Sequence, residues 1–214
     1  MGVIFTIGIL WILLLNNIFG LPDVAFLKTE NPVRTAFMQR YEGEKPLQQE
    51  WVSFAQISPY LKEAVVLAED DRFFEHGGLD WQAIKEAAEK NWERKEFRWG
   101  ASTITQQVAK NLFLSPSKNP FRKIKEMLIA FQLEENLSKQ RILEIYLNVA
   151  EWGEGIFGAQ AAAKHYYNTN AQRLGPTEAC WLAAILPNPR FYQNHANSRF
   201  IEKKVRGLLR MMGY

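Results

Sequence analysis

The stretch from Ser58 to Asp71 reads SPYLKEAVVLAEDD and combines a helix start, an apolar helix face and an acidic end. Serine followed by proline is typical of a helix N-terminus, with serine as the N-cap and proline at the first helical position. Apolar residues then recur at helical spacing, at Leu61, Ala64, Val65 and Ala68. The pattern predicts an amphipathic helix that ends near Asp71.

The rest of the chain repeats the helical pattern. Further helices are predicted at 81–92, 102–113, 119–136, from 138 onward, and at 156–167, 177–186 and 199–212. Clean alternation of apolar and polar residues, the mark of a half-buried strand, is not found, and neither is an internal repeat. The expected fold class is therefore all-α.

Composition limits the possible functions. The 214 residues suffice for one domain plus an appendage, and 26 Lys plus Arg against 23 Asp plus Glu argue against a nucleic-acid binder. The single cysteine, Cys180, excludes an intrachain disulfide or a site of several thiolates. Three histidines without HExxH-type spacing give no dedicated metal cage.

The N-terminal stretch Val3–Leu21 carries no charge and is about as long as a helix that crosses hydrocarbon, roughly 17 to 25 residues. A signal peptide is the alternative, but a basic n-region and a cleavage signature are missing. We expect a transmembrane anchor at 1–21, a linker at 22–49 with a short helix around Phe37, and a globular domain at 50–214. Basic residues after the span weakly favour a body inside the cell.

Glu69 is the first candidate for chemistry. At about 100° per residue it falls close to Val65 on the apolar side of its helix, where a solvated acid would not lie. A carboxylate against a low-dielectric wall tends to have a raised pKa, which suits a general base. A helix-end acid paired with Arg72 is the alternative.

Two further elements offer ligand-binding groups. The segment 100–107 reads GASTITQQ, in which small residues permit close backbone approach and hydroxyl and amide groups can meet sugar or phosphate oxygens. Five cations follow before the next acid, at Lys110, Lys118, Arg122, Lys123 and Lys125. Several stand in the first turns of a predicted helix, where the macrodipole disfavours positive charge, so an anion such as pyrophosphate would relieve the conflict.

Glu126 completes the set of candidates. Its helix carries apolar residues on two opposite faces, which predicts a central helix and a buried Glu126. An ordinary i, i+4 pair between Arg122 and Glu126 is the alternative, worth about a few tenths of a kcal/mol if exposed.

Four motifs in this order resemble those of the peptidoglycan glycosyltransferases, glycosyltransferase family 51. They are Glu69-Asp70 with Phe73, His76 and Gly78; GASTITQQ with Lys110-Asn111; Arg122-Lys123 with Glu126; and Arg141-Ile142-Leu143-Glu144 with Tyr146-Leu147-Asn148. The similarity spans roughly 56–190. The short chain with one N-terminal span resembles the monofunctional biosynthetic transglycosylases of that family.

The resemblance implies a lysozyme-like helical domain with a large lobe and a small membrane-proximal jaw, preceded by one transmembrane helix. It places this domain in the periplasm, on the bacterial inner membrane, against the weak charge argument. Lipid II would be the acceptor and the growing lipid-linked glycan the donor, giving a β-1,4-linked strand and free undecaprenyl pyrophosphate. Membrane lipid, and proteins of cell division or wall synthesis, are the further partners expected, and nucleic acid is not.

The resemblance also assigns roles to residues. Glu69 matches the catalytic base and Glu126 the second glutamate, which assists at the donor side. The implied substrate-binding residues are Asp70, Phe73, His76, Ser102, Thr103, Gln106, Gln107, Lys110, Asn111, Lys118, Arg122, Lys123 and Lys125. Ala101 replaces a glycine of the commoner motif, and Lys118 stands where arginine is frequent.

No cofactor is required by the sequence, but a divalent cation, Mg²⁺ or Mn²⁺, could join the lysines at the pyrophosphate. The aromatic and basic stretch Trp92–Trp99 is expected to contact lipid headgroups. A lysozyme-like hydrolase, and a membrane scaffold that only binds lipid-linked sugars, are the alternative functions.

Overall fold

The helix predicted from SPYLKEAVVLAEDD is α3 (Pro59–Glu69), the first long helix among the described residues of the computed structural model. The structure describes residues 20–94, 102–115, 120–196 and 198–214. Ser58 takes the N-cap place as predicted, but its hydroxyl donates to the carbonyl of Leu174 at 2.6 Å and does not cap the helix. The start of α3 is thereby tied to a distant part of the chain.

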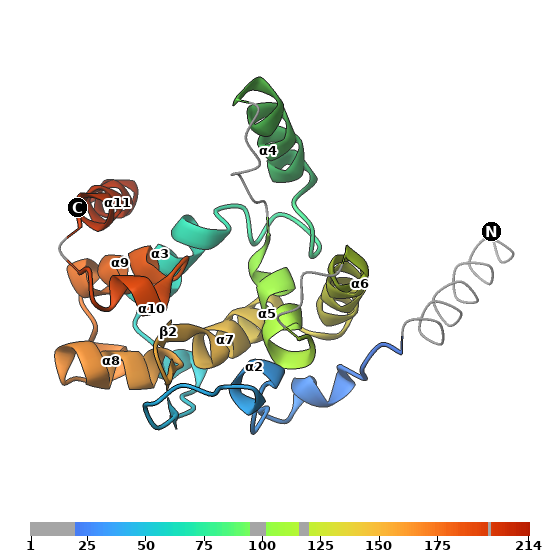
Figure 1. Ribbon diagram of the computed structural model, residues 1–214, viewed down its shortest axis with the longest axis horizontal. Coiled ribbons are helices and arrows are strands. Elements are labelled where there is room, and N and C mark those ends of the chain that lie inside the picture. Colours follow the sequence, from blue (N-terminus) through green and yellow to red (C-terminus); the bar gives the residue numbers. More distant parts are fainter. Residues whose placement is uncertain (1–19, 95–101, 116–119, 197) are drawn as a thin grey trace, which may run out of the picture.

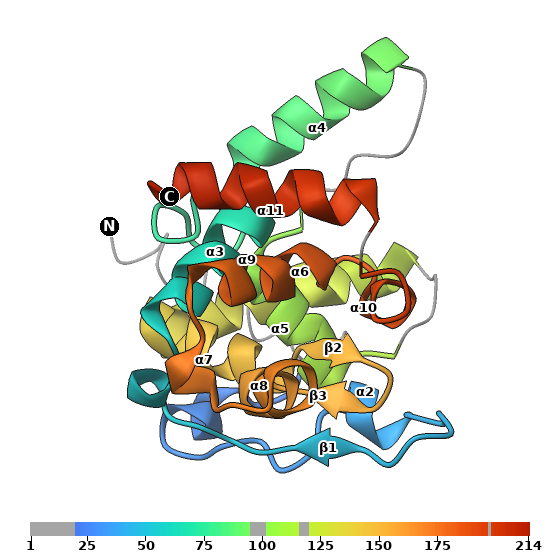
Figure 2. The same cartoon turned by 90° about the vertical axis from the view of Figure 1, so that its left-hand side faces the viewer.

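The body is built from two groups of helices (Figure 1). In one, α3 packs against α9 (Pro176–Ile185), and α11 (Arg199–Met211) lies across both, as Figure 2 shows. In the other, α5 (Ile104–Phe113) packs against α6 (Pro120–Asn136) and α7 (Lys139–Val149). From Ile142 to Val149, every residue of α7 except Glu144 is buried.

The remaining elements surround this body. α4 (Trp81–Arg94) projects away from it in both views (Figures 1 and 2). The others are η1 (Ala25–Lys28), α2 (Ala36–Gln39), η2 (Phe54–Gln56), α8 (Ala159–Tyr167), η3 (Ala171–Arg173) and α10 (Pro189–Tyr192). The prediction of a predominantly helical domain is confirmed.

A small sheet was not predicted. It contains β1 (Gln48–Gln49), β2 (Glu151–Gly153) and β3 (Ile156–Phe157), in the order β1-β3-β2. β1 is parallel and β2 antiparallel to β3. Because Ile156 and Phe157 are extended, the helix predicted at 156–167 begins only at Ala159. Gly158 makes the turn with φ 84°, and a Cβ there would lie 2.7 Å from the carbonyl oxygen of Asn148.

The segment 22–49 was expected to be a linker, but it packs against the domain. The guanidinium of Arg141 donates to the carbonyls of Leu27 and Glu30, at 2.9 and 2.8 Å, and to Asn31. Val24, Leu27 and Met38 are buried, and β1 joins the sheet. The short helix expected around Phe37 is confirmed as α2.

The predicted anchor at 1–21 lies outside the described residues except for Gly20 and Leu21. Among the residues that are described, none of the helices combines the length and apolar composition needed to cross a membrane.

The prediction that α6 is a central helix is wrong. One of its faces is buried through Glu126, Ile129, Ala130 and Leu133, as expected. The opposite face is apolar but exposed, with Phe121 at 68%, Ile124 at 44% and Phe131 at 38%. Two apolar faces can mean burial on both sides or an apolar face left on the surface, and the helical pattern does not distinguish them.

Candidate active site

Glu69 is the last residue of α3 and is turned inward, as its helical position predicts. Its side chain is 11% exposed. The Oε2 atom accepts a hydrogen bond from Gln107 Nε2 at 2.9 Å, and Lys204 Nζ lies 4.0 Å from Oε1. Burial raises the pKa of the Glu69 carboxyl, and the Gln107 hydrogen bond and two lysines, Lys204 and Lys110, oppose that rise. The alternative of a pair with Arg72 is excluded, because Arg72 binds Asp80 at 2.9 Å.

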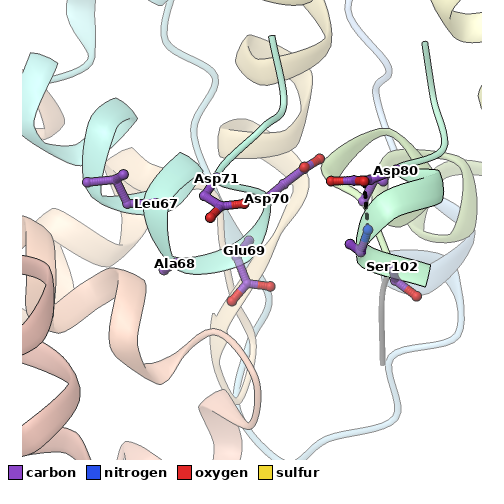
Figure 3. Close-up of a pocket in the computed structure, with 9 residues that line it drawn as sticks. Leu67, Ala68, Glu69, Asp70, Asp71, Asp80 and Ser102 are labelled. Atoms are coloured by element: carbon purple, nitrogen blue, oxygen red, sulfur yellow. Dashed lines mark hydrogen bonds between the residues drawn. The ribbon is translucent and has the colours of Figure 1, made fainter. Parts of the chain in front are cut away.

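Asp70 leaves the end of α3 in a different direction from Glu69 (Figure 3). Its Oδ1 atom lies 2.8 Å from His76 Nε2, and its Oδ2 atom accepts from the backbone N–H of Ile104 at 2.9 Å. Asp70 therefore joins the end of α3 to the start of α5. Phe73 is fully buried. These residues, which the family resemblance assigns to the substrate, have structural contacts that hold the neighbouring elements in place.

The start of α5 is fixed by a capping box. Thr103 Oγ1 accepts from the N–H of Gln106, and Gln106 Oε1 accepts from the N–H of Thr103 at 3.0 Å. Both residues are buried, and Thr103 also donates to the carbonyl of Gly78 at 2.6 Å. Their polar atoms are therefore engaged in hydrogen bonds that stabilise the fold. Ser102 and Gln107 are the members of this motif whose polar groups reach Lys123 and Glu69.

A partly buried lysine, Lys110, interacts with both glutamates. Lys110 interacts electrostatically with Glu126 and with Glu69, and burial lowers the pKa of its ammonium group. Glu126 has a side chain that is 4% exposed. Lys123 forms a close ion pair with Glu126, and Arg122 Nη1 lies 3.7 Å from Glu126 Oε2. The i, i+4 pair considered for Arg122 is present, but as part of a cluster of three cations and a buried carboxylate.

The structure does not bring every predicted cation into this cluster. Lys125 is partly exposed on α6, and the described ion pairs of Glu126 come from Arg122 and Lys123. Lys118 lies outside the described residues, as does most of the stretch Trp92–Trp99.

Two cavities border the Glu69–Gln107 hydrogen bond. The first, of about 270 Å³, is lined by Glu69 together with Asp70, Asp71, Asp80, Ser102 and Thr103 (Figure 3). The second, of about 240 Å³, is lined by Gln107 together with Lys110, Asn111, Tyr146 and Glu151. Each is slightly smaller than a typical ligand pocket, and each is lined by one member of the bonded pair.

One group in the described part of the chain has ligand atoms close enough to hold a metal ion: Asp70, His76 and Asp80. The Asp70 oxygens are bonded to His76 and to Ile104. The Asp80 oxygens are bonded to Arg72, at 2.9 and 3.1 Å, and to the N–H of Ala83. Arg72 neutralises the Asp80 carboxylate, and these contacts occupy the oxygens of both carboxylates, so the group does not form a ready ion site.

Comparisons with known proteins decide the family. Residues 34–213 match the protein family described as Transglycosylase. The chain belongs to the transglycosylase family. The biosynthetic peptidoglycan transglycosylase of Chromobacterium violaceum is 45% identical over 208 residues, 94% of this chain and 91% of that protein. The proteins of the same name from Nitrosomonas eutropha and Laribacter hongkongensis are 48% and 43% identical, over 94% and 97% of this chain and 85% and 94% of their own lengths.

The candidate site includes two residues to which the sequence assigned no role. Lys204 comes from α11, far along the chain from Glu69, and sits in an ordinary amphipathic pattern of basic and apolar residues. Tyr146 was noted only as part of a motif, and its hydroxyl donates to Gln107 Oε1 at 3.2 Å. A helical wheel of α7 places Tyr146 among core residues, so no local signal distinguishes it.

Proposed function

We propose that this transglycosylase polymerises peptidoglycan glycan strands from lipid II. The observation that carries the proposal is that Lys110, a partly buried cation, interacts electrostatically with both inward-turned glutamates. Charge of this kind, held before the reaction begins, stabilises a leaving diphosphate more in the transition state than in the ground state. The names of the relatives support the same reaction class.

In the proposed reaction, Glu69 removes the proton from the 4-hydroxyl of the acceptor sugar. The acceptor oxygen attacks the anomeric carbon of the donor, and the bond from that carbon to the diphosphate breaks. The electron pair leaves on the diphosphate oxygen, beside Lys110, Arg122 and Lys123. Attack opposite to the leaving group inverts an α-linked donor and gives a β-1,4-linked product. The proton stays on Glu69 until it is lost to solvent.

Glu126 has a positioning role in this scheme. Its carboxylate is nearly fully buried and holds Lys123 and Arg122 on one side of the cluster. A carboxylate beside several cations also reduces their mutual repulsion while no substrate is bound. This agrees with the role at the donor side that the family resemblance assigns to it.

Labelled lipid II tests the proposal against both alternatives. Incubation with the full chain in detergent or vesicles is expected to yield long glycan strands, separated from lipid II by gel electrophoresis. A hydrolase would instead shorten preformed glycan strands supplied in the same assay. A scaffold would bind lipid II without lengthening it. Either of these last two results would remove the polymerase from consideration.

Lys204 provides a prediction on pH dependence. The ammonium group near Oε1 favours the ionised form of Glu69, so Lys204→Gln is expected to raise the pKa of Glu69. Activity needs the ionised base, is present above this pKa and is lost as the pH falls through it. The acid limb of the kcat profile should therefore move to higher pH, by about half a unit for a partly screened pair. The neighbouring exposed Lys203→Gln is the control and should leave the limb in place.

The cations of the chain lead us to propose that a divalent ion is not essential. Glu126 interacts with Lys110, Arg122 and Lys123 and is already ion-paired with the last two. An ion would have to arrive with the diphosphate itself. We expect polymerisation to persist when Mg²⁺ is replaced by a chelator, as measured by the lipid II assay. Complete loss in chelator, restored by Mg²⁺ or Mn²⁺, would contradict this.

We further propose that the catalytic domain is lysozyme-like, with a large lobe and a membrane-proximal jaw, and faces the periplasm from an anchor at 1–21. The exposed apolar face of α6 supports a membrane-proximal position, because large apolar patches are uncommon on soluble surfaces. On α4, Trp81 and Trp92 are 65% and 87% exposed. Tryptophan is typical of the interface between lipid and water.

A further inference from the structure

Glu69 has one oxygen occupied and one that can receive a proton. Oε2 accepts the hydrogen bond from Gln107, whereas Oε1 faces the ammonium group of Lys204 at 4.0 Å. A carboxylate that must take a proton from a substrate benefits when one oxygen is held, because the other then has a fixed direction. The Gln107 amide is the group that holds it.

An amide can present either end to its neighbour. If Gln107 turned its carbonyl to Glu69, the ionised carboxylate would meet an acceptor and lose its donor. A donor at the carbonyl end of the amide would reinforce the orientation with Nε2 toward Glu69. Tyr146 is such a donor, since its hydroxyl donates to Gln107 Oε1 at 3.2 Å.

Tyr146 is suited to a fixed donor role. Its side chain is buried on α7, and α7 packs against α5, which carries Gln107. Burial raises the pKa of the Tyr146 phenol well above its usual value, and the nearby Glu69 and Asp70 raise it further. Both effects favour the protonated hydroxyl, which is the form that can donate to Gln107.

We infer that Tyr146 is a positioning residue for the catalytic base: it fixes the Gln107 amide, which holds Oε2 of Glu69 and leaves Oε1 to take the acceptor proton. The inference rests on the proposed role of Glu69. The charged groups that act on Glu69 are Lys204 from α11, Lys110 from α5 and the adjoining Asp70. None of these is altered when the Tyr146 hydroxyl is removed.

Tyr146→Phe removes the hydroxyl and keeps the ring. The freed amide favours the protonated form of Glu69, so its pKa rises and the acid limb of the kcat profile moves up by about half to one pH unit. At neutral pH, kcat should fall about three- to tenfold with KM for lipid II within about twofold, since one hydrogen bond near a charged group is lost.

Tyr166→Phe is the matched control. The Tyr166 hydroxyl donates to the carbonyl of Trp152 at 2.7 Å, away from Gln107. Tyr166→Phe should lower the melting temperature without moving the acid limb of the kcat profile. If Tyr146→Phe behaves in the same way, with lower stability and an unchanged limb, the positioning role is overturned.

A double variant separates this inference from the proposed function. A Gln107→Leu variant already lacks the amide that links Tyr146 to Glu69. Adding Tyr146→Phe to it should therefore give no further shift of the acid limb of the kcat profile. Additive shifts would overturn the inference while wild-type polymerisation stands. Failure of the wild-type chain to lengthen lipid II would instead overturn the proposed function.

Discussion

Glu69→Gln is expected to abolish glycan polymerisation and to leave the fold intact. Glutamine has nearly the same shape and can still accept the hydrogen bond from Gln107 through its carbonyl oxygen. It cannot take up the proton of the acceptor hydroxyl. General base catalysis contributes roughly 10²- to 10⁴-fold, so kcat with lipid II should fall by about that factor. The assay is polymer formation from labelled lipid II, with circular dichroism as the check on folding.

The control for this change is Glu178→Gln on α9. Glu178 is also a partly buried glutamate with a local hydrogen bond, to the N–H of Gly175 at 2.8 Å, but it lies in a helix cap. It should lower stability slightly and preserve turnover. A folded Glu69→Gln enzyme with full polymerising activity would show that another group is the base.

Lys110→Met is the second change expected to have a large effect. It removes the cation that acts on both glutamates and replaces it with an apolar, unbranched side chain of similar length. Removal of one preorganised group that stabilises developing charge typically costs about 10²- to 10³-fold in kcat. We expect a loss of that size, with a smaller change in KM because the lost interaction is strongest in the transition state.

The stability of the Lys110→Met protein should distinguish a functional from a structural lysine. Burial lowers the pKa of Lys110, so its charge is held at a cost to the folded state. Glu126 keeps Arg122 and Lys123 as partners. The melting temperature should therefore stay the same or rise. Lys110→Arg keeps the charge and should retain more activity; a Met variant with wild-type kcat would remove Lys110 from the mechanism.

The sequence predicted most helices because their signals are local. Ser138 caps α7, and Thr103 with Gln106 caps α5, each within one helical turn. The sheet was missed because strands of two or three residues are too short to show alternation. The packing of 22–49 was missed because its partner, Arg141, lies more than a hundred residues further along the chain.

In the candidate site, too, features set within one helix were predicted, whereas contacts between distant helices were not. The inward direction of Glu69 follows from its place on one helix, and the prediction is confirmed. Burial of Glu126 was also predicted correctly, although the exposed face of the same helix was not. Lys204 and the bond from Tyr146 to Gln107 depend on how α11 and α7 meet α3 and α5. Contacts of this kind are set by tertiary packing, and no spacing in the sequence reveals them.

The contacts of Arg141 with Leu27, Glu30 and Asn31 have a consequence for how the enzyme meets its substrate. A flexible tether of that length would let the domain sample many heights and tilts above a bilayer. With the proposed anchor at 1–21, a segment fastened to α7 would instead hold the two cavities beside Glu69 and Gln107 at one height above the bilayer. We therefore expect lipid-linked sugars to reach these cavities by diffusing laterally within the leaflet, without a movement of the domain toward them.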